Sequence, residues 1–188
     1  MPLPKVPLFK ILALYAMVVF QNAAVAGALG ITTGYFDMIV ETSDGNSRLA
    51  NLGVYRFLYQ IPVSDHVTAV PGYSFYFTSF DLGDSGYGVD LEINYFPFTY
   101  NQPMVMASNR ISWFLAEEWR PSVGLAFHQR QFQVVRSAYG GIGLTINCDY
   151  QLSEMLAALI KIEYSVLRGP LKSTLSERQI SFGITRSL

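Results

Sequence analysis

Apolar and polar residues alternate with a period of two over much of this chain. Between positions 87 and 95 the apolar residues are Tyr87, Val89, Leu91, Ile93 and Tyr95. Glycine, acidic and amide residues take the positions between them, and 142–150 and 156–166 repeat the pattern. Because successive side chains of a β-strand point to opposite faces, this alternation predicts strands whose two faces meet unlike surroundings.

These strands fit a membrane better than water. They reach ten or eleven residues, the length of a strand that crosses a bilayer at a tilt. Tyrosines close their apolar faces, as in the aromatic girdles of membrane barrels. The opposite faces carry charges of both signs, yet charged residues make up only 14% of the chain, against roughly 25% in soluble domains. A secreted β-sandwich is the alternative, although its water-facing strands would carry more lysine.

Composition excludes several other classes of protein. An apolar content of 51% excludes a disordered chain. A net charge of -1 leaves no basic footprint for nucleic acid, and a single cysteine excludes an internal disulfide framework. The two histidines and the cysteine lie far apart and give no metal-ligand spacing, so no metal or cofactor is expected.

The start of the chain has the three parts of a secretory signal peptide. Two lysines, Lys5 and Lys10, precede an apolar run over 11–20, and an Ala-Val-Ala cleavage motif ends at Ala26. A retained N-terminal anchor is the alternative, but ten residues span about 15 Å as a helix, half of a bilayer core of roughly 30 Å. We therefore expect a cleaved signal peptide over 1–26 and a barrel over 27–188.

The remainder divides into eight candidate strands. They cover 29–41, 51–61, 67–80, 87–96, 122–134, 140–150, 155–166 and 178–188. An even number places both ends of a barrel on one side, which is the periplasmic side in bacterial barrels. The loops expected on the outer side are 42–50, 81–86, 135–139 and 167–177. The predicted fold is all-β: an eight-stranded antiparallel transmembrane β-barrel.

Residues 97–121 break the alternation. Apolar residues at positions 111, 114, 115 and 119 are spaced as on one face of a helix. We expect a periplasmic turn here with a short amphipathic helix at the membrane interface. A ninth strand over 104–115 would break the even count, and two long strand ends joined by an irregular turn are the other alternative.

The last 70 residues resemble a known family. The stretches that carry the resemblance are Arg120-Pro121-Ser122-Val123-Gly124-Leu125, Tyr139-Gly140-Gly141-Ile142-Gly143-Leu144, Asp149-Tyr150-Gln151-Leu152-Ser153 and Ile162-Glu163-Tyr164. Their succession is similar to the small outer-membrane barrels of the OmpA/OmpX/OmpW type. The resemblance implies an eight-stranded barrel in the cell outer membrane of a Gram-negative bacterium, inserted by the outer-membrane assembly machinery. The last strand departs from the family pattern, because it ends in Leu188 rather than Phe and carries Arg186.

If the apolar faces meet lipid, the polar faces point into the barrel lumen. The predicted lumen residues are Arg56, Gln60, Asp90, Glu92, Asn94, His128, Arg130, Asn147, Asp149, Lys161, Glu163 and Gln179. Side chains just fill the interior of an eight-stranded barrel, and an unpaired buried charge is strongly unfavourable. We therefore expect a network of ion pairs and hydrogen bonds that fills the lumen.

Two non-catalytic functions fit such a barrel. The first is a structural or surface-interaction role, exercised through short extracellular loops among outer-membrane lipid and lipopolysaccharide. Arg48, Arg168, Lys172 and Arg178 are candidate contacts to lipopolysaccharide phosphates, since guanidinium groups bind phosphate bidentately. The second is a narrow, porin-like channel for small solutes.

The third function is a lipid-modifying outer-membrane enzyme, and the residues favour it least. A serine mechanism needs serine, histidine and an acid within hydrogen-bond reach. His128 is the better histidine candidate, but its same-face neighbours are Ala126 and Arg130 rather than serine. We therefore expect no enzymatic activity and no catalytic residue.

Overall fold

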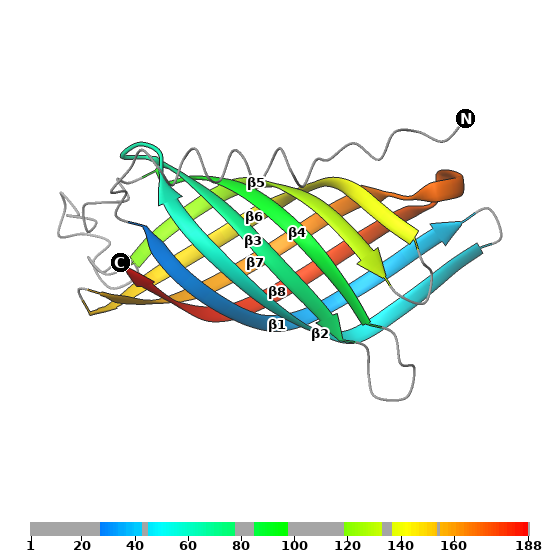
Figure 1. Cartoon of the computed structure of the whole chain (residues 1–188), viewed down its shortest axis with the longest axis horizontal. Coiled ribbons are helices and arrows are strands. Elements are labelled where there is room, and N and C mark those ends of the chain that lie inside the picture. The colour runs from blue at the N-terminus through cyan, green and yellow to red at the C-terminus, as the bar shows by residue number, and fades with distance from the viewer. Residues whose placement is uncertain are drawn as a thin grey trace, which may run out of the picture.

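The computed structural model describes residues 27–42, 45–77, 85–97, 119–132, 137–153 and 155–187. They form a closed barrel of eight antiparallel strands (Figure 1). The strands are β1 (Ala28–Thr42), β2 (Gly45–Pro62), β3 (Val67–Phe77), β4 (Ser85–Tyr95), β5 (Trp119–Phe132), β6 (Ser137–Ser153), β7 (Leu156–Arg168) and β8 (Thr174–Ser187). Each strand pairs with its neighbour in the chain, and β1 pairs with β8 to close the barrel. The predicted eight-stranded barrel is confirmed.

The two ends of the barrel differ. Ala28 pairs with Ser187, so the first and last strands begin and finish together, at what we call the terminal end. Strands β2, β4 and β6 end there, and β3, β5 and β7 begin there. At the opposite end, which we call the hairpin end, β1, β3, β5 and β7 end, and β2, β4, β6 and β8 begin (Figure 1).

Six of the strands, β1, β2, β4, β6, β7 and β8, extend further toward the hairpin end than predicted. The expected loop 42–50 is wrong, because β2 begins at Gly45 and pairs with β1 up to Thr42. The expected loop 167–177 is also wrong. It shrinks to a tight connection with a 3-10 turn at Pro170–Lys172, since β7 runs to Arg168 and β8 begins at Thr174. The expected loops 81–86 and 135–139 lose their last residues to β4 and β6 in the same way.

Two predicted segments lie mainly outside the described residues. The signal peptide over 1–26 lies wholly outside, as does 98–118 of the expected turn at 97–121. The last three residues of that turn belong to a strand, because β5 begins at Trp119. Within the described residues, no helix is long and apolar enough to cross a membrane.

His66 fixes the turn between β2 and β3 to the neighbouring strand. Its Nδ1 atom lies 2.9 Å from the carbonyl oxygen of Phe96, and its ring stacks on Tyr95 with centroids 5.9 Å apart. The backbone N–H groups of Val63 and Ser64 donate to the carbonyl of Val67. This histidine therefore has a structural role at the terminal end of the barrel.

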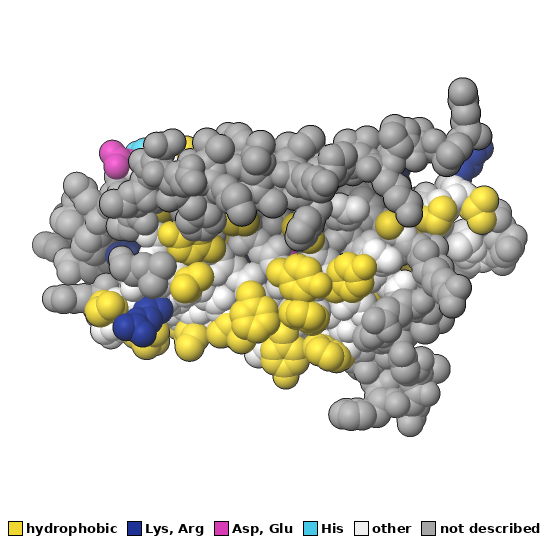
Figure 2. Space-filling model, viewed as in Figure 1, with side chains coloured by type: hydrophobic (Ala, Val, Ile, Leu, Met, Phe, Trp, Pro, Cys, Tyr) yellow, Lys and Arg dark blue, Asp and Glu magenta, His cyan; other side chains and the backbone are white. Residues whose placement is uncertain are grey.

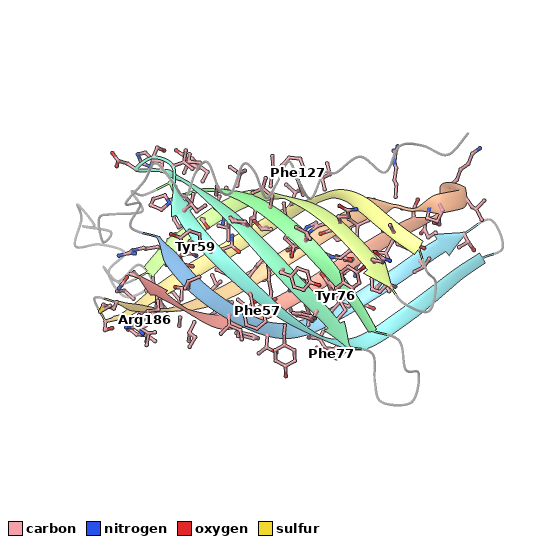
Figure 3. All side chains as sticks on the ribbon, in the orientation of Figure 1. Phe57, Tyr59, Tyr76, Phe77, Phe127 and Arg186 are labelled. Carbon is pink, nitrogen blue, oxygen red and sulfur yellow. The ribbon has the colours of Figure 1, made fainter. Side chains whose placement is uncertain are left out.

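The outer surface of the barrel is apolar around its middle. Figure 2 shows hydrophobic side chains across the middle of the visible face, with Lys and Arg side chains toward its ends. The side chains of Leu144 and Ile146 are 64% and 61% exposed. Exposure of such an apolar surface is unfavourable in water, and contact with lipid explains it. Phe57, Phe77 and Phe127 point outward from three strands, whereas Tyr76 points inward (Figure 3).

Candidate functional site: the barrel interior

The interior is where polar side chains from most strands converge. All ten residues predicted to form the polar network, together with Gln60 and Gln179, are buried and expose 5% or less of their surface. They are Arg56, Asp90, Glu92, Asn94, His128, Arg130, Asn147, Asp149, Lys161 and Glu163. Because they sit on the inward parity of paired strands, the antiparallel register brings acids and bases to the same height.

Asp90 on β4 lies at the centre of this network. Its Oδ1 accepts a hydrogen bond from Arg130 and lies 2.6 Å from Nδ1 of His128. Its Oδ2 accepts a hydrogen bond of 2.5 Å from Ser74 and lies 3.4 Å from Nε of Arg56. One buried carboxylate thus joins groups from β2, β3 and β5. A charge removed from water in this way needs such partners to remain ionised.

A second set of contacts runs across the lumen. Lys161 on β7 places its Nζ atom 2.6 Å from Oε2 of Glu92 on β4 and 2.6 Å from Oε2 of Glu163. Arg56 on β2 donates to Glu92 through Nη1 at 3.0 Å, and Asn147 donates to its other oxygen at 2.8 Å. The bonds to Glu92 join strands that do not pair with each other, so they fill the barrel and brace it.

The network continues toward the hairpin end through His128 and Arg130. Nε2 of His128 lies 2.8 Å from Oε1 of Glu163, so its imidazole bridges this carboxylate and Asp90. Nε of Arg130 lies 3.4 Å from Oε1 of Glu177 on β8. The guanidinium also lies over the ring of Tyr76, 5.1 Å from its centroid, which is within cation–π range.

The interior at the terminal end is less densely charged. Asn147 donates to Asn94 at 3.0 Å, and Gln60 donates to Asp149 at 3.4 Å. A cavity of about 10 Å³ lies between these amides and Lys161. That volume suits about one water molecule.

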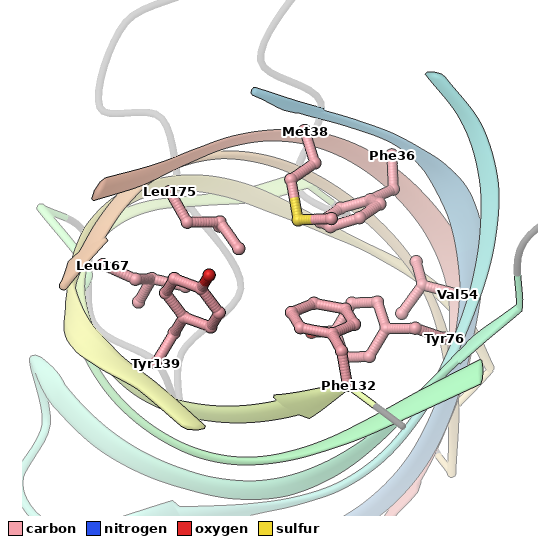
Figure 4. Close-up of a cluster of buried hydrophobic side chains, with 8 residues drawn as sticks. All are labelled: Phe36, Met38, Val54, Tyr76, Phe132, Tyr139, Leu167 and Leu175. Atoms are coloured by element: carbon pink, nitrogen blue, oxygen red, sulfur yellow. The ribbon is translucent and has the colours of Figure 1, made fainter. Parts of the chain in front are cut away.

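At the hairpin end the interior becomes apolar. The buried cluster there, which we call the apolar cluster, consists of Phe36, Met38, Val54, Tyr76, Phe132, Tyr139, Leu167 and Leu175. Figure 4 shows these side chains projecting from the wall into the lumen. The rings of Phe36, Tyr76, Phe132 and Tyr139 follow one another at centroid distances of 5.1, 5.9 and 6.2 Å.

The polarity of the inner and outer faces of β1 is reversed between its two ends. Toward the terminal end, apolar Leu29 and Ile31 face outward while Thr32 is buried inside. Toward the hairpin end, Phe36 and Met38 are buried inside, while Asp37 lies on the outer face. This part of the barrel is therefore built like a soluble protein, apolar inside and polar outside, and it marks where the lipid belt ends.

Sequence reasoning missed several inward groups, for two different reasons. Glu177 was not expected in the lumen because β8 was taken to begin at residue 178, whereas it begins at Thr174. Glu177 lies two residues before Gln179 and therefore on the same face of the strand, which could have indicated its inward position. Ser74 and Ser165, which donate to Asp90 and Glu163, carry no such signal, since serine is ordinary in strands and in turns.

The candidate phosphate-binding side chains do not converge on one loop. Arg168 ends β7, Lys172 lies in the 3-10 turn and Arg178 lies on the outer face of β8, and all three are exposed. The side chain of Arg48 lies outside the described part of the structure. Arg178 borders a groove of about 190 Å³ on the outer wall, between β7, β8 and β1.

The interior geometry favours structure over chemistry. His128 is held between the carboxylates of Asp90 and Glu163, and Ser74 and Ser165 donate to these same two acids. The part of the chain that the structure describes also holds no group of three His, Cys, Asp or Glu side chains placed to bind a metal ion. Such an arrangement can hold charges in place and exclude water.

Comparisons with known proteins identify the fold. No family model and no curated protein matches this chain. Neisserial surface protein A has a solved structure with a TM-score of 0.58 at 12% identity, covering 86% of this chain and 99% of that one. The N-terminal β-barrel domain of OprF from Pseudomonas aeruginosa matches with a TM-score of 0.49 at 15% identity, covering 85% and 97%.

The chain therefore has the fold of the small eight-stranded outer-membrane β-barrels. The apolar belt on its outer surface is that of a protein surrounded by lipid. Together, the closed barrel and the belt place the chain in the outer membrane.

Proposed function

We propose that this protein is a sealed outer-membrane barrel with a structural or surface-interaction role rather than a solute channel. The observation that carries the proposal is the filled interior. Charged side chains from opposite walls meet at 2.6 Å in the middle of the lumen, and the apolar cluster occupies the hairpin end. An ion crossing the barrel would have to break buried ion pairs and then pass an apolar section.

The proposed orientation follows the rule for bacterial barrels. The terminal end faces the periplasm and the hairpin end faces the cell exterior, since both chain ends of such barrels lie in the periplasm. The protein then presents the tight hairpin between β7 and β8, with exposed Leu171 at its tip, to the outside. Rigid, short hairpins suit contact with neighbouring surface molecules better than the enclosure of a large ligand.

Planar-bilayer recording tests the proposal. Refolded wild-type protein should insert without stable current steps, while a general porin measured in the same bilayers gives them. A quadruple variant that removes large interior groups (Arg130→Ala, Lys161→Ala, Phe132→Ala and Tyr139→Ala) has a wider lumen and should leak in samples whose heat-shifted gel mobility shows a folded barrel. Stable, repeated steps from the wild-type barrel would overturn the sealed lumen and support the narrow channel.

A further inference from the structure

The outer wall carries a groove that the sealed lumen does not use. It has a volume of about 190 Å³ and lies across β7, β8 and β1. Its lining consists of Asp37, Ile39, Glu41, Tyr164, Ser176 and Arg178. Charged and hydroxyl groups on the outside of a membrane barrel are costly within the hydrocarbon, so this groove marks the level where the lipid headgroups begin.

The strand register locates that level. Tyr164, Arg178 and Asp37 lie side by side across β7, β8 and β1. Two residues nearer the terminal end, the corresponding row is Ile162, Ile180 and Tyr35, and these side chains belong to the apolar belt. The groove therefore starts where the apolar belt ends, and it extends toward the hairpin end.

Guanidinium and carboxylate groups lie at two levels of this wall. Arg178 is the register partner of Asp37. Two rows further out, Arg168 on β7 and Glu41 on β1 flank Thr174 on β8. The two rows are four residues apart, or about 13 Å along a strand. A single phosphate cannot reach both levels, whereas a sugar disaccharide with a phosphate at each end can.

We propose that this groove binds the bis-phosphorylated disaccharide headgroup of lipid A, the glycolipid of the outer leaflet. Arg178 and Arg168 bind its two phosphates, since the guanidinium fork matches phosphate geometry. Asp37 and Glu41 bind divalent cations that bridge the protein to the same phosphates, because Mg²⁺ joins carboxylates to phosphate oxygens. The inference rests on the proposed orientation, in which the hairpin end faces the cell exterior.

The charge balance of the groove predicts dependence on a divalent cation. The lining has two carboxylates and one guanidinium, and Arg168 lies beside it at the level of Glu41, so these four groups supply no net positive charge to attract phosphate without added cations. The groove thus differs from a purely basic patch, which would bind the anion directly. Chelation of the cation should release the lipid while leaving the barrel folded.

Native mass spectrometry of the refolded full barrel in detergent tests the site with three defined lipids. These are bis-phosphorylated lipid A, its monophosphorylated form and phosphatidylethanolamine, each titrated with Mg²⁺ and with a chelator. Arg178→Gln, Asp37→Asn and Glu41→Gln alter the groove. Arg186→Gln is the matched control, because Arg186 is exposed on the same face of β8 at the terminal end.

The expected result is tightest binding of bis-phosphorylated lipid A in Mg²⁺, with about tenfold weaker binding for Arg178→Gln, the loss of one charge-assisted contact. The two carboxylate variants should lose the effect of Mg²⁺, and Arg186→Gln should bind like wild type. Equal affinities for Arg178→Gln and Arg186→Gln would overturn the site, as would phosphatidylethanolamine binding as tightly as lipid A. Heat-shifted gel mobility of each sample shows that the barrel is folded, and planar-bilayer recording tests the sealed lumen separately, so failure of the groove is distinguishable from failure of the proposed function.

Discussion

Lys161 on β7 and Glu92 on β4 form an ion pair of 2.6 Å across the barrel interior. The same ammonium lies 2.6 Å from Glu163, so one lysine contacts two carboxylates on strands that do not pair with each other. All three side chains expose 3% or less of their surface. Interior charge in this barrel is therefore cross-bracing, and its removal from one side leaves uncompensated charge on the other.

Replacement of Lys161 by methionine should lower the free energy of unfolding by about 3–5 kcal/mol, the usual effect of breaking a buried ion pair from one side. Urea unfolding in lipid vesicles, followed by tryptophan fluorescence, measures it. The double variant Lys161→Met, Glu92→Gln should recover part of the loss, because it also removes the charge of the carboxylate that lost its ammonium, while Glu163 keeps its contact with His128. Equal stability of the Lys161→Met variant and the wild type would show that the pair does not form.

Arg130→Met should destabilise the barrel at least as strongly. This guanidinium contacts Asp90 and Glu177 and covers the ring of Tyr76, so its loss affects the ionic network and the apolar cluster together. Arg186→Met is the control, since an exposed arginine outside the network should change stability by no more than about 0.5 kcal/mol. The same unfolding assay compares the two. Equal effects of both substitutions would remove the special role of the interior arginine.

Two leucines in the β7–β8 hairpin provide a test of the apolar cluster. Leu167 is fully buried in it, whereas Leu171 is 95% exposed at the tip. Leu167→Ala should cost about 2–5 kcal/mol through lost burial and a cavity, while Leu171→Ala should change stability by less than about 0.5 kcal/mol. Unfolding midpoints that shift equally would mean that the cluster does not pack inside the barrel.

Gly88 leaves room for Arg130, its register partner on β5. A Cβ atom at this position would lie 2.7 Å from Nη1 and 2.8 Å from Cδ of that arginine, and 3.0 Å from the backbone oxygen of Gln129. Gly88→Ala should therefore cost about 1–3 kcal/mol through overpacking. Gly53→Ala is the control, because its Cβ would meet nothing within 4 Å. A neutral Gly88→Ala would contradict the interior placement of Arg130.

The sequence was sufficient for the fold and for most interior charges because alternation acts locally. Once Leu91 and Ile93 are taken to face lipid, Asp90 and Glu92 must face inward, whatever the rest of the chain does. The pattern could not predict which interior side chains contact one another. The contact between Lys161 and Glu92 depends on barrel closure and on the relative heights of β4 and β7, which no local pattern encodes.

The strands at the hairpin end were predicted poorly because the apolar face points inward there, whereas it faces lipid along the rest of the barrel. The apolar residues Phe36 and Met38 lie at inward-facing positions of β1. The charged Asp37 lies on the outer face, which meets lipid nearer the terminal end. A reading that assigns every apolar face to lipid interprets such residues as the end of a strand. For this reason the expected loops 42–50 and 167–177 were too long, and Glu177 was left out of the lumen.

Heat-modifiable gel mobility, measured on the outer-membrane fraction, tests the closed membrane barrel most directly. Because the barrel is held by a continuous ring of strand pairs and buried ion pairs, the unheated protein should stay folded in detergent and migrate differently from the boiled protein. Migration that boiling leaves unchanged, or recovery of the protein in the soluble periplasmic fraction, would contradict the account.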